Sequence, residues 1–234
     1  MIAGLQKMTL LDYPGRVACT VFLQGCNFRC PFCHNTDLLP PHGEALMTED
    51  ALIAFLEKRT GLLDGVCITG GEPTLYHGLP ELLRRIKALG YAVKLDTNGF
   101  QPQVLKDLVG EKRIDYVAVD VKNSPLRYAQ TAGVPGLKLE KFEETIRFLL
   151  EDPIPYELRT TVVEPLHDEA SIRDMGIWLS SLTPGKKPAK LFLQGFVDRD
   201  TVAFDGLRAA GKDTMEKYVS LLRPYIGEVA LRGE

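Results

Sequence analysis

The sequence has 234 residues, of which 45% are hydrophobic and 25% are charged, and this composition is typical of a soluble globular protein. Lys and Arg (28) nearly balance Asp and Glu (31), so the net charge of −3 argues against a nucleic-acid binder that relies on bulk positive charge. The five cysteines are odd in number and three of them lie within residues 26–33, which is not the pattern of a secreted disulfide scaffold.

The apolar segments of the sequence are short. None of them approaches the ~18 apolar residues of a membrane span, and the first residues lack the charged and apolar regions of a signal peptide. We therefore expect a cytoplasmic protein with reduced thiols, and neither nucleic acid nor a membrane as its partner.

Segments rich in β-branched residues alternate with amphipathic segments along the chain. In chain order, they predict a lead-in over 1–16, a strand over 17–23, a helix over 48–59, a strand over 65–69, a helix over 80–89, a strand over 91–97, a helix over 102–109, a strand over 116–121, a helix over 139–150, a strand over 157–163, a helix over 169–182, a strand over 190–194, a helix over 214–222 and a short strand over 228–231. Thr48 is a suitable N-cap for the first helix, and Gly90 is a suitable end for the second.

This alternation gives six β-then-α units with no break in composition. Such a pattern predicts an α/β fold with a parallel sheet and outer helices. A full eight-unit barrel takes about 250 residues, so we expect a partial (βα)6 TIM-like barrel that forms one domain over 1–234. A doubly wound open sheet is the competing architecture. In both, functional loops follow the C-terminal ends of the strands.

Three cysteines follow the first predicted strand with the spacing C-x3-C-x2-C, at Cys26, Cys30 and Cys33. A loop that wraps around a common centre could bring the three thiolates together, and thiolates are the ligands of iron–sulfur clusters. Two other interpretations are a structural zinc site with His34 as the fourth ligand and three ordinary buried thiols. The position at the end of the first strand favours an active site over a structural zinc.

Polar residues also follow the second strand, where the sequence reads Gly70-Gly71-Glu72-Pro73. Two glycines let the backbone approach a ligand closely, and Glu72 could accept a hydrogen bond from an ammonium group. A plain strand-to-helix turn is the alternative for this stretch.

Carboxylates end the next two strands, at Asp96 and Asp120. Asp120 and Lys122 face the same side of a strand with a period of two residues. The alternative for Asp96 is an Asx-type turn, which Asn98-Gly99 also favours. Arg159 lies inside the fifth strand, and if it faces inward it needs an anionic partner.

The cysteine motif, with Phe32 directly before its last cysteine, resembles that of the radical S-adenosylmethionine (SAM) superfamily. Gly70-Gly71-Glu72-Pro73 is similar to the motif that holds the amino group of SAM in that superfamily. Within it, the chain looks like the glycyl-radical-enzyme activases. Residues 9–16, Thr-Leu-Leu-Asp-Tyr-Pro-Gly-Arg, are most similar to anaerobic ribonucleoside-triphosphate reductase activating proteins. They depart from the pyruvate formate-lyase activase pattern, in which Gly usually occupies the position of Tyr13.

The resemblance implies a role for each matching residue. Cys26, Cys30 and Cys33 would ligate a 4Fe-4S cluster, and no side chain is expected to be catalytic beyond the cluster and SAM. The expected SAM-binding residues are Phe32 near the adenine, Gly70, Gly71 and Glu72 at the methionyl amino group, and Asp96, Asn98, Lys122 and Arg159. Asp96, Thr97 and Asp120 would bind a monovalent cation beside the SAM carboxylate.

The resemblance also implies a reaction. The reduced cluster would cleave SAM, and the adenosyl radical would take a hydrogen from a glycine Cα in the large subunit of an anaerobic ribonucleotide reductase. A flavodoxin- or ferredoxin-type protein would supply the electron. The alternatives are a pyruvate formate-lyase-type activase, a radical SAM enzyme acting on a small molecule such as a deazaguanine precursor, and a zinc-stabilised binding module. Cys19 and Cys67, inside the first two strands, are expected to be buried and too few for a second cluster.

Overall fold

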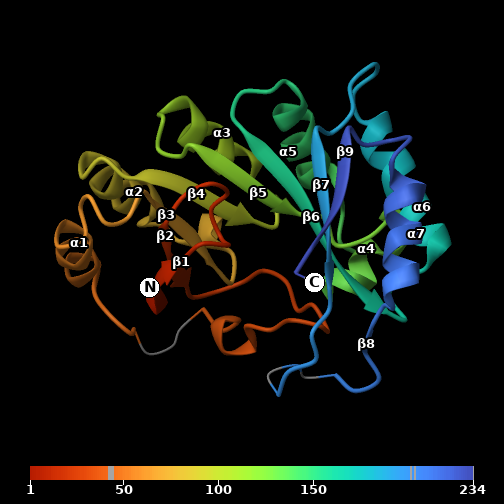
Figure 1. Cartoon of the computed structure of the whole chain (residues 1–234), viewed down its shortest axis with the longest axis horizontal. Coiled ribbons are helices and arrows are strands. Elements are labelled where there is room, and N and C mark those ends of the chain that lie inside the picture. The colour runs from red at the N-terminus through yellow and green to blue at the C-terminus, as the bar shows by residue number, and fades with distance from the viewer. Residues whose placement is uncertain (42–44, 201, 203, 234) are drawn as a thin grey trace. The chain divides into compact units, whose positions relative to one another are not determined.

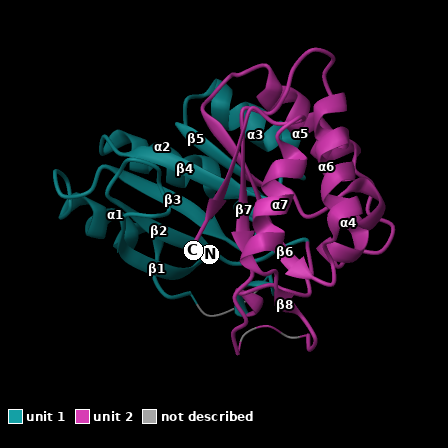
Figure 2. Cartoon of the chain, turned by 45° about the vertical axis from the view of Figure 1, so that its right-hand side comes forward, with its two compact units in different colours: residues 1–27, 37–118 teal, residues 28–36, 119–234 magenta. Residues whose placement is uncertain are grey.

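The computed structural model describes residues 1–41, 45–200, 202 and 204–233 (Figure 1). The chain divides into two compact units, residues 1–27 with 37–118 and residues 28–36 with 119–234 (Figure 2). In the part of the chain that the structure describes, none of the helices could cross a membrane.

The first unit is built on parallel strands with one antiparallel strand beside them. Its elements are β1 (Ile2–Thr9), β2 (Ala18–Leu23), α1 (Glu49–Glu57), β3 (Gly65–Gly70), the 3-10 helix η2 (Pro73–Leu75), α2 (Leu79–Ala88), β4 (Ala92–Thr97) and α3 (Pro102–Gly110). Strand β2 pairs in parallel with β3, and β3 with β4, whereas β1 runs antiparallel to β2. The helices bury their apolar faces, including Leu52 and Leu56 of α1.

Strand β5 (Tyr116–Asp120) carries the chain from the first unit into the second. The elements that follow are α4 (Pro125–Ala132), α5 (Glu140–Leu150), β6 (Tyr156–Glu164), α6 (Glu169–Ser181), β7 (Lys190–Gly195), β8 (Arg208–Ala209), α7 (Lys212–Leu222) and β9 (Glu228–Arg232). Strand β6 pairs in parallel with β7, and β7 with β9, while the short β8 pairs antiparallel with β6. The remaining short helix, η1 (Thr36–Leu38), lies in the loop after β2.

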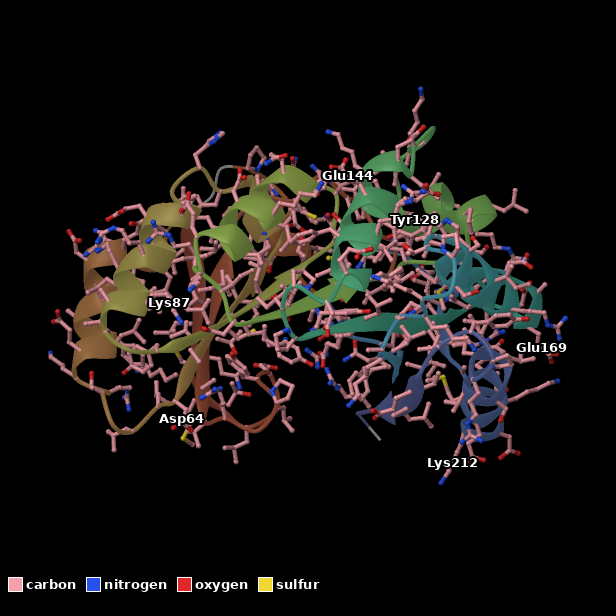
Figure 3. All side chains as sticks on the ribbon, turned by 90° about the horizontal axis from the view of Figure 1, so that it is seen from above. Asp64, Lys87, Tyr128, Glu144, Glu169 and Lys212 are labelled. Atoms are coloured by element: carbon pink, nitrogen blue, oxygen red, sulfur yellow. The ribbon has the colours of Figure 1, made fainter. Side chains whose placement is uncertain are left out.

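An aromatic cluster joins three helices of the second unit. The ring centroids of Tyr128 and Phe142 are 5.2 Å apart, and those of Phe142 and Trp178 are 5.4 Å apart. These residues come from α4, α5 and α6, and Figure 3 labels Tyr128 among the side chains of this region. Because aromatic pairs at such separations add to the stability gained from burial, the cluster fixes α4 against the longer helices.

The predicted α/β class with parallel strands and outer helices is confirmed. All the predicted strands and helices are present, and the described residues contain six β-then-α units. Thr48 is the N-cap of α1, and its side chain accepts a hydrogen bond from the Ala51 N–H. Gly90 follows α2 with a φ of 87°. The structure also contains elements that were not predicted: β1, in the expected lead-in, α4, the two-residue strand β8 and the short 3-10 helices η1 and η2.

Candidate functional site

The loop after β3 depends on two glycines that allow close backbone contact. A Cβ on Gly70 would lie 2.3 Å from the backbone N and O of Leu23, and a Cβ on Gly71 would lie 2.2 Å from the Gly25 O. The Glu72 N–H donates to that same Gly25 oxygen at 2.7 Å. The predicted Gly-Gly-Glu-Pro motif therefore lies directly against the start of the cysteine loop.

Glu72 is buried in the first unit, with 1% of its surface exposed. Its Oε1 accepts from Thr97 Oγ1 at 2.7 Å and from the Thr74 N–H at 3.1 Å, and its Oε2 accepts from the Asn98 N–H at 2.6 Å. Burial raises the pKa of Glu72, and these hydrogen bonds lower it in part. The carboxylate thus joins the loop after β3 to the end of β4. The predicted contact of Glu72 with a ligand ammonium stays a prediction.

Asn98 connects the end of β4 to the cysteine loop. Its Nδ2 donates to Asn27 Oδ1 at 2.7 Å, and its Oδ1 accepts from the Phe100 N–H at 3.1 Å. The second bond forms an Asx-type turn on Asn98, which the Asn98-Gly99 pair favoured, with Gly99 at a φ of 78°. Asp96, for which such a turn was the alternative, forms an ion pair with Lys94. Sequence reasoning missed Asn27. Its only signal was its position next to Cys26.

Asp96 forms an ion pair with Lys94, the residue two positions earlier on β4. The Lys94 side chain is 1% exposed, and its Nζ also lies 4.0 Å from Cys67 Sγ. We did not predict a role for Lys94. The period-two argument that placed Asp120 and Lys122 on one side of a strand applies equally to Lys94 and Asp96, and could have found it.

The cysteine loop begins in the first unit, which contains Cys26. The Gly25 N–H donates to the Leu38 O at 2.8 Å, and the Cys26 N–H donates to the Leu39 O at 3.3 Å. Cys26 itself is partly exposed. A returning segment of the loop thus holds the backbone of Gly25 and Cys26 in place.

Cys30 and Cys33 lie in the second unit, where helix α4 supports them. The Arg29 N–H donates to the Ala132 O at 2.9 Å, and the Cys33 N–H donates to the Cys30 O at 3.1 Å. Gly133 ends α4 with a φ of 66°, and a Cβ there would lie 1.9 Å from the Arg29 O. The C-terminal end of α4 is therefore pressed against the cysteine loop.

Phe32 is buried within the second unit, with 6% of its surface exposed. It packs with Val163 and Phe196. The Nζ of Lys122 lies 6.0 Å from the centroid of its ring. The predicted position of Phe32 near an adenine stays a prediction.

Asp120, the last residue of β5, is the centre of a charged group that includes Lys122 and Arg159 from the middle of β6. Its Oδ2 accepts from Lys122 Nζ at 3.2 Å, and its Oδ1 accepts from Arg159 Nε at 3.0 Å and from Nη2 at 2.9 Å. Burial by itself would raise the pKa of Asp120, but the charges of Arg159 and Lys122 outweigh it and lower the pKa to about 2. The expected common side of Asp120 and Lys122 is confirmed, and Arg159 has the anionic partner that an inward side chain requires.

Two buried polar side chains fix the loop that carries Lys122. His167 Nε2 contacts the Lys122 O at 2.8 Å, and its Nδ1 accepts from the Val163 N–H at 3.1 Å. Asn123 Nδ2 donates to Thr131 Oγ1 and to the Leu166 O, each at 2.9 Å. The loops after β5 and β6 are therefore tied to each other and to α4.

Residues 20–175, which include both the cysteine loop and the Gly-Gly-Glu-Pro turn, match the sequence profile of the Radical SAM superfamily. The chain belongs to the radical SAM superfamily. It is accordingly a radical SAM oxidoreductase, as the resemblance predicted.

Relatives of this radical SAM enzyme include activating and small-molecule enzymes. The chain is 30% identical over 241 residues to a candidate glycyl-radical enzyme activating enzyme of Methanocaldococcus jannaschii, covering 99% of this chain and 95% of the relative. It is 35% identical over 129 residues to a 7-carboxy-7-deazaguanine synthase of Hyperthermus butylicus, covering 54% of this chain and 50% of the relative. A radical SAM methyltransferase of Sphaerobacter thermophilus has a similar fold, with a TM-score of 0.72 and 15% identity over 96% of this chain and 68% of the other.

Membership of the superfamily implies SAM and an iron–sulfur cluster as cofactors. The cysteines of the chain fit an iron–sulfur cluster. All five lie in the described residues and none forms a disulfide, and the three that are not buried are Cys26, Cys30 and Cys33. Among the described residues, no three His, Cys, Asp or Glu side chains form a site for a single metal ion. His34, the fourth ligand of the zinc alternative, instead contacts the Val197 O through Nε2 at 2.6 Å and stacks on Phe196.

The Asp120 group leads to a prediction about acid stability. Because the pKa of Asp120 is about 2 in the folded protein, below its ordinary value of 3.8, its ion pairs stabilise the protein above pH 4. That stabilisation is lost as the pH falls towards 2. In Asp120→Asn, the free energy of unfolding is expected to be lower at pH 7 and to fall less between pH 4 and pH 2, measured by urea unfolding at each pH. An unchanged acid dependence would contradict the role of these pairs.

Proposed function

We propose that this radical SAM enzyme activates an anaerobic ribonucleoside-triphosphate reductase by generating a glycyl radical on its large subunit. The observation that carries the proposal is the relationship to the Methanocaldococcus jannaschii protein, which extends over 99% of this chain. The choice of a reductase as the partner rests on the similarity of residues 9–16 to the reductase activases. A flavodoxin- or ferredoxin-type donor, a cytoplasmic location and a single functional domain over 1–234 are parts of the same proposal.

In this proposal, side chains and backbone groups at the strand ends and in the loops of the chain hold the cofactors. The cluster, when bound, would supply one electron that cleaves the C5′–S bond of SAM to give methionine. The adenosyl fragment would then take one hydrogen from a glycine Cα of the reductase. The residues that would hold the 4Fe-4S cluster are Cys26, Cys30 and Cys33. Those that would hold SAM are Gly70, Gly71 and Glu72 at its amino group, Phe32 at its adenine, Lys122 and Arg159 at SAM or its carboxylate, and Asp96 and Asn98.

The chain's own hydrogen bonds support this division of roles. The bond from the Glu72 N–H to the Gly25 O and the bond from Asn98 to Asn27 both connect the proposed amino-group site to the cysteine loop. Such outer hydrogen bonds orient the ligands of a metal centre. Binding and orientation are what the protein must contribute, because the cofactors carry the bond-breaking chemistry.

The test is anaerobic incubation of the reconstituted enzyme with SAM, a reductant and the large subunit of the reductase. We expect a glycyl-radical signal by electron paramagnetic resonance, with methionine and 5′-deoxyadenosine formed in matching amounts. A reductase with Ala at its radical glycine is the control and is expected to give no signal. SAM cleavage that leaves no radical on the intact reductase would contradict the proposal.

A second candidate is a small-molecule reaction, because the chain is 35% identical to a 7-carboxy-7-deazaguanine synthase over half its length. The same incubation separates the two, since a small-molecule enzyme would leave the reductase without a radical. Turnover of the deazaguanine precursor, measured in parallel, would establish this alternative.

A further inference from the structure

Lys94 is a buried ammonium in the interior of the first unit. The strand register aligns it with Cys67 of β3, and Cys67 with Thr20 of β2, so these three positions form one row across the sheet. Only 1% of the Lys94 side chain is exposed, and its Nζ contacts Asp96 Oδ1. Lysine is almost never fully buried without a partner, so the position of the ammonium is set by the carboxylate of Asp96.

The ion pair means that the negative charge of Asp96 is balanced by a side chain of the protein itself. The family resemblance predicts that Asp96, Thr97 and Asp120 bind a monovalent cation. In the first unit, however, the ammonium of Lys94 already contacts Asp96. Thr97 Oγ1 also has two partners, because it donates to Glu72 at 2.7 Å and accepts from the Gly99 N–H at 3.1 Å.

The third predicted ligand is engaged in the same way. In the second unit, Lys122 and Arg159 both donate to Asp120. Each of the two carboxylates therefore has a positively charged side chain of the protein as its partner. A further positive ion at either carboxylate would be repelled by a fixed cation within a few ångströms.

We propose that Lys94 supplies the positive charge that a bound monovalent cation would otherwise supply beside Asp96, and that this enzyme binds SAM without such a cation. The inference rests on the proposed function, because it takes SAM as the ligand of this site. It predicts that the SAM affinity and the thermal midpoint of the wild-type protein do not depend on K⁺ or Na⁺.

The first experiment compares the reconstituted wild-type enzyme in K⁺ or Na⁺ with the same enzyme in N-methylglucamine, an organic cation too large for a protein cage. Two quantities are measured: the dissociation constant for SAM, by calorimetry, and the thermal midpoint without SAM. Both are expected to be nearly unchanged, with affinities within about twofold. A loss of SAM affinity of about tenfold or more on removal of K⁺ and Na⁺ would overturn the inference.

The second experiment uses Lys94→Met, which keeps most of the side-chain volume and removes the charge. The buried carboxylate then lacks its partner, so K⁺ is expected to raise the thermal midpoint and to improve SAM affinity by about tenfold. The matched control, Lys94→Met with Asp96→Asn, removes both charges and is expected to show no response to K⁺. A single variant that is as indifferent to K⁺ as the double variant would overturn the inference.

SAM affinity and the thermal midpoint test this inference, whereas the glycyl radical on the reductase tests the proposed function. An enzyme that binds SAM but never forms a glycyl radical on the reductase contradicts only the proposed function. If SAM does not bind at all, the thermal midpoints of the three proteins still show whether K⁺ replaces Lys94. If Lys94→Met does not fold, the indifference of the wild type to K⁺ and Na⁺ decides the question.

Discussion

Replacing Cys26, Cys30 or Cys33 with Ala is expected to abolish reductive cleavage of SAM. Each of the three is partly exposed, and they occupy the loop directly after β2, where the C-terminal ends of parallel strands carry active sites. A cluster with one thiolate missing loses a ligand that Cys19 and Cys67 cannot replace, because both are buried. The measurements are iron and sulfide content, the electron paramagnetic resonance spectrum of the reduced protein, and release of 5′-deoxyadenosine.

Cys19→Ala is the matched control for these variants. Cys19 is fully buried in β2, and burial raises the pKa of its thiol to about 12. Its burial in the interior of the first unit keeps it out of reach of a cluster in the loop after β2. The control is expected to lose about 1 kcal/mol of stability and to keep its iron and its SAM cleavage. Wild-type cleavage in any of the three loop variants, or uptake of zinc without iron by the wild type, would contradict the ligand assignment.

The regular part of the fold could be predicted from sequence because each element carries its own local signal. The predicted strand over 65–69 is β3 (Gly65–Gly70), and the predicted helix over 139–150 is α5 (Glu140–Leu150). Buried strands such as β3 read as short apolar runs, and helices such as α5 show apolar residues at a helical spacing. Those patterns depend only on neighbours along the chain.

Of the elements that were missed, the two longest, β1 and α4, lack such patterns. Strand β1 (Ile2–Thr9) has three exposed residues in a row, and its pairing with β2 becomes evident only in the folded sheet. Helix α4 (Pro125–Ala132) buries Tyr128, Thr131 and Ala132, a face that is hardly apolar in sequence. Its better signal was Pro125 at the first turn and Gly133 after the end, the usual asymmetry of helix termini.

The contacts of the candidate site were likewise predictable only where they follow from a local pattern in the sequence. The grouping of Asp120 with Lys122 followed from the two-residue period of a strand, and the need of Arg159 for an anion followed from the cost of an unpaired buried charge. The partners of Glu72 did not follow, because Thr97 and Asn98 are distant in sequence and meet it only through the register of β3 and β4. Tertiary hydrogen bonds of this kind leave no local pattern to read.

Gly71→Ala is expected to disable the site through the backbone alone. The added Cβ would lie 2.2 Å from the Gly25 O and 2.7 Å from the Gly25 C, both of them main-chain atoms that cannot rotate away. The loop that begins at Gly25 must then shift, and the bond from the Glu72 N–H to the Gly25 O is lost with it. We expect a loss of about 3 kcal/mol in the free energy of unfolding and at least about a tenfold loss in SAM affinity.

Gly110→Ala is the control that separates this contact from a general effect of replacing glycine. Gly110 is the last residue of α3, and a Cβ there meets nothing within 4 Å. Because alanine restricts the unfolded chain more than glycine does, this variant is expected to be unchanged or more stable by about 0.5 kcal/mol, with normal SAM affinity. Urea unfolding and calorimetry on the two variants give the comparison. If Gly71→Ala matched Gly110→Ala in both, the close approach of the two loops would not be required, and the proposed SAM site would have to be formed without it.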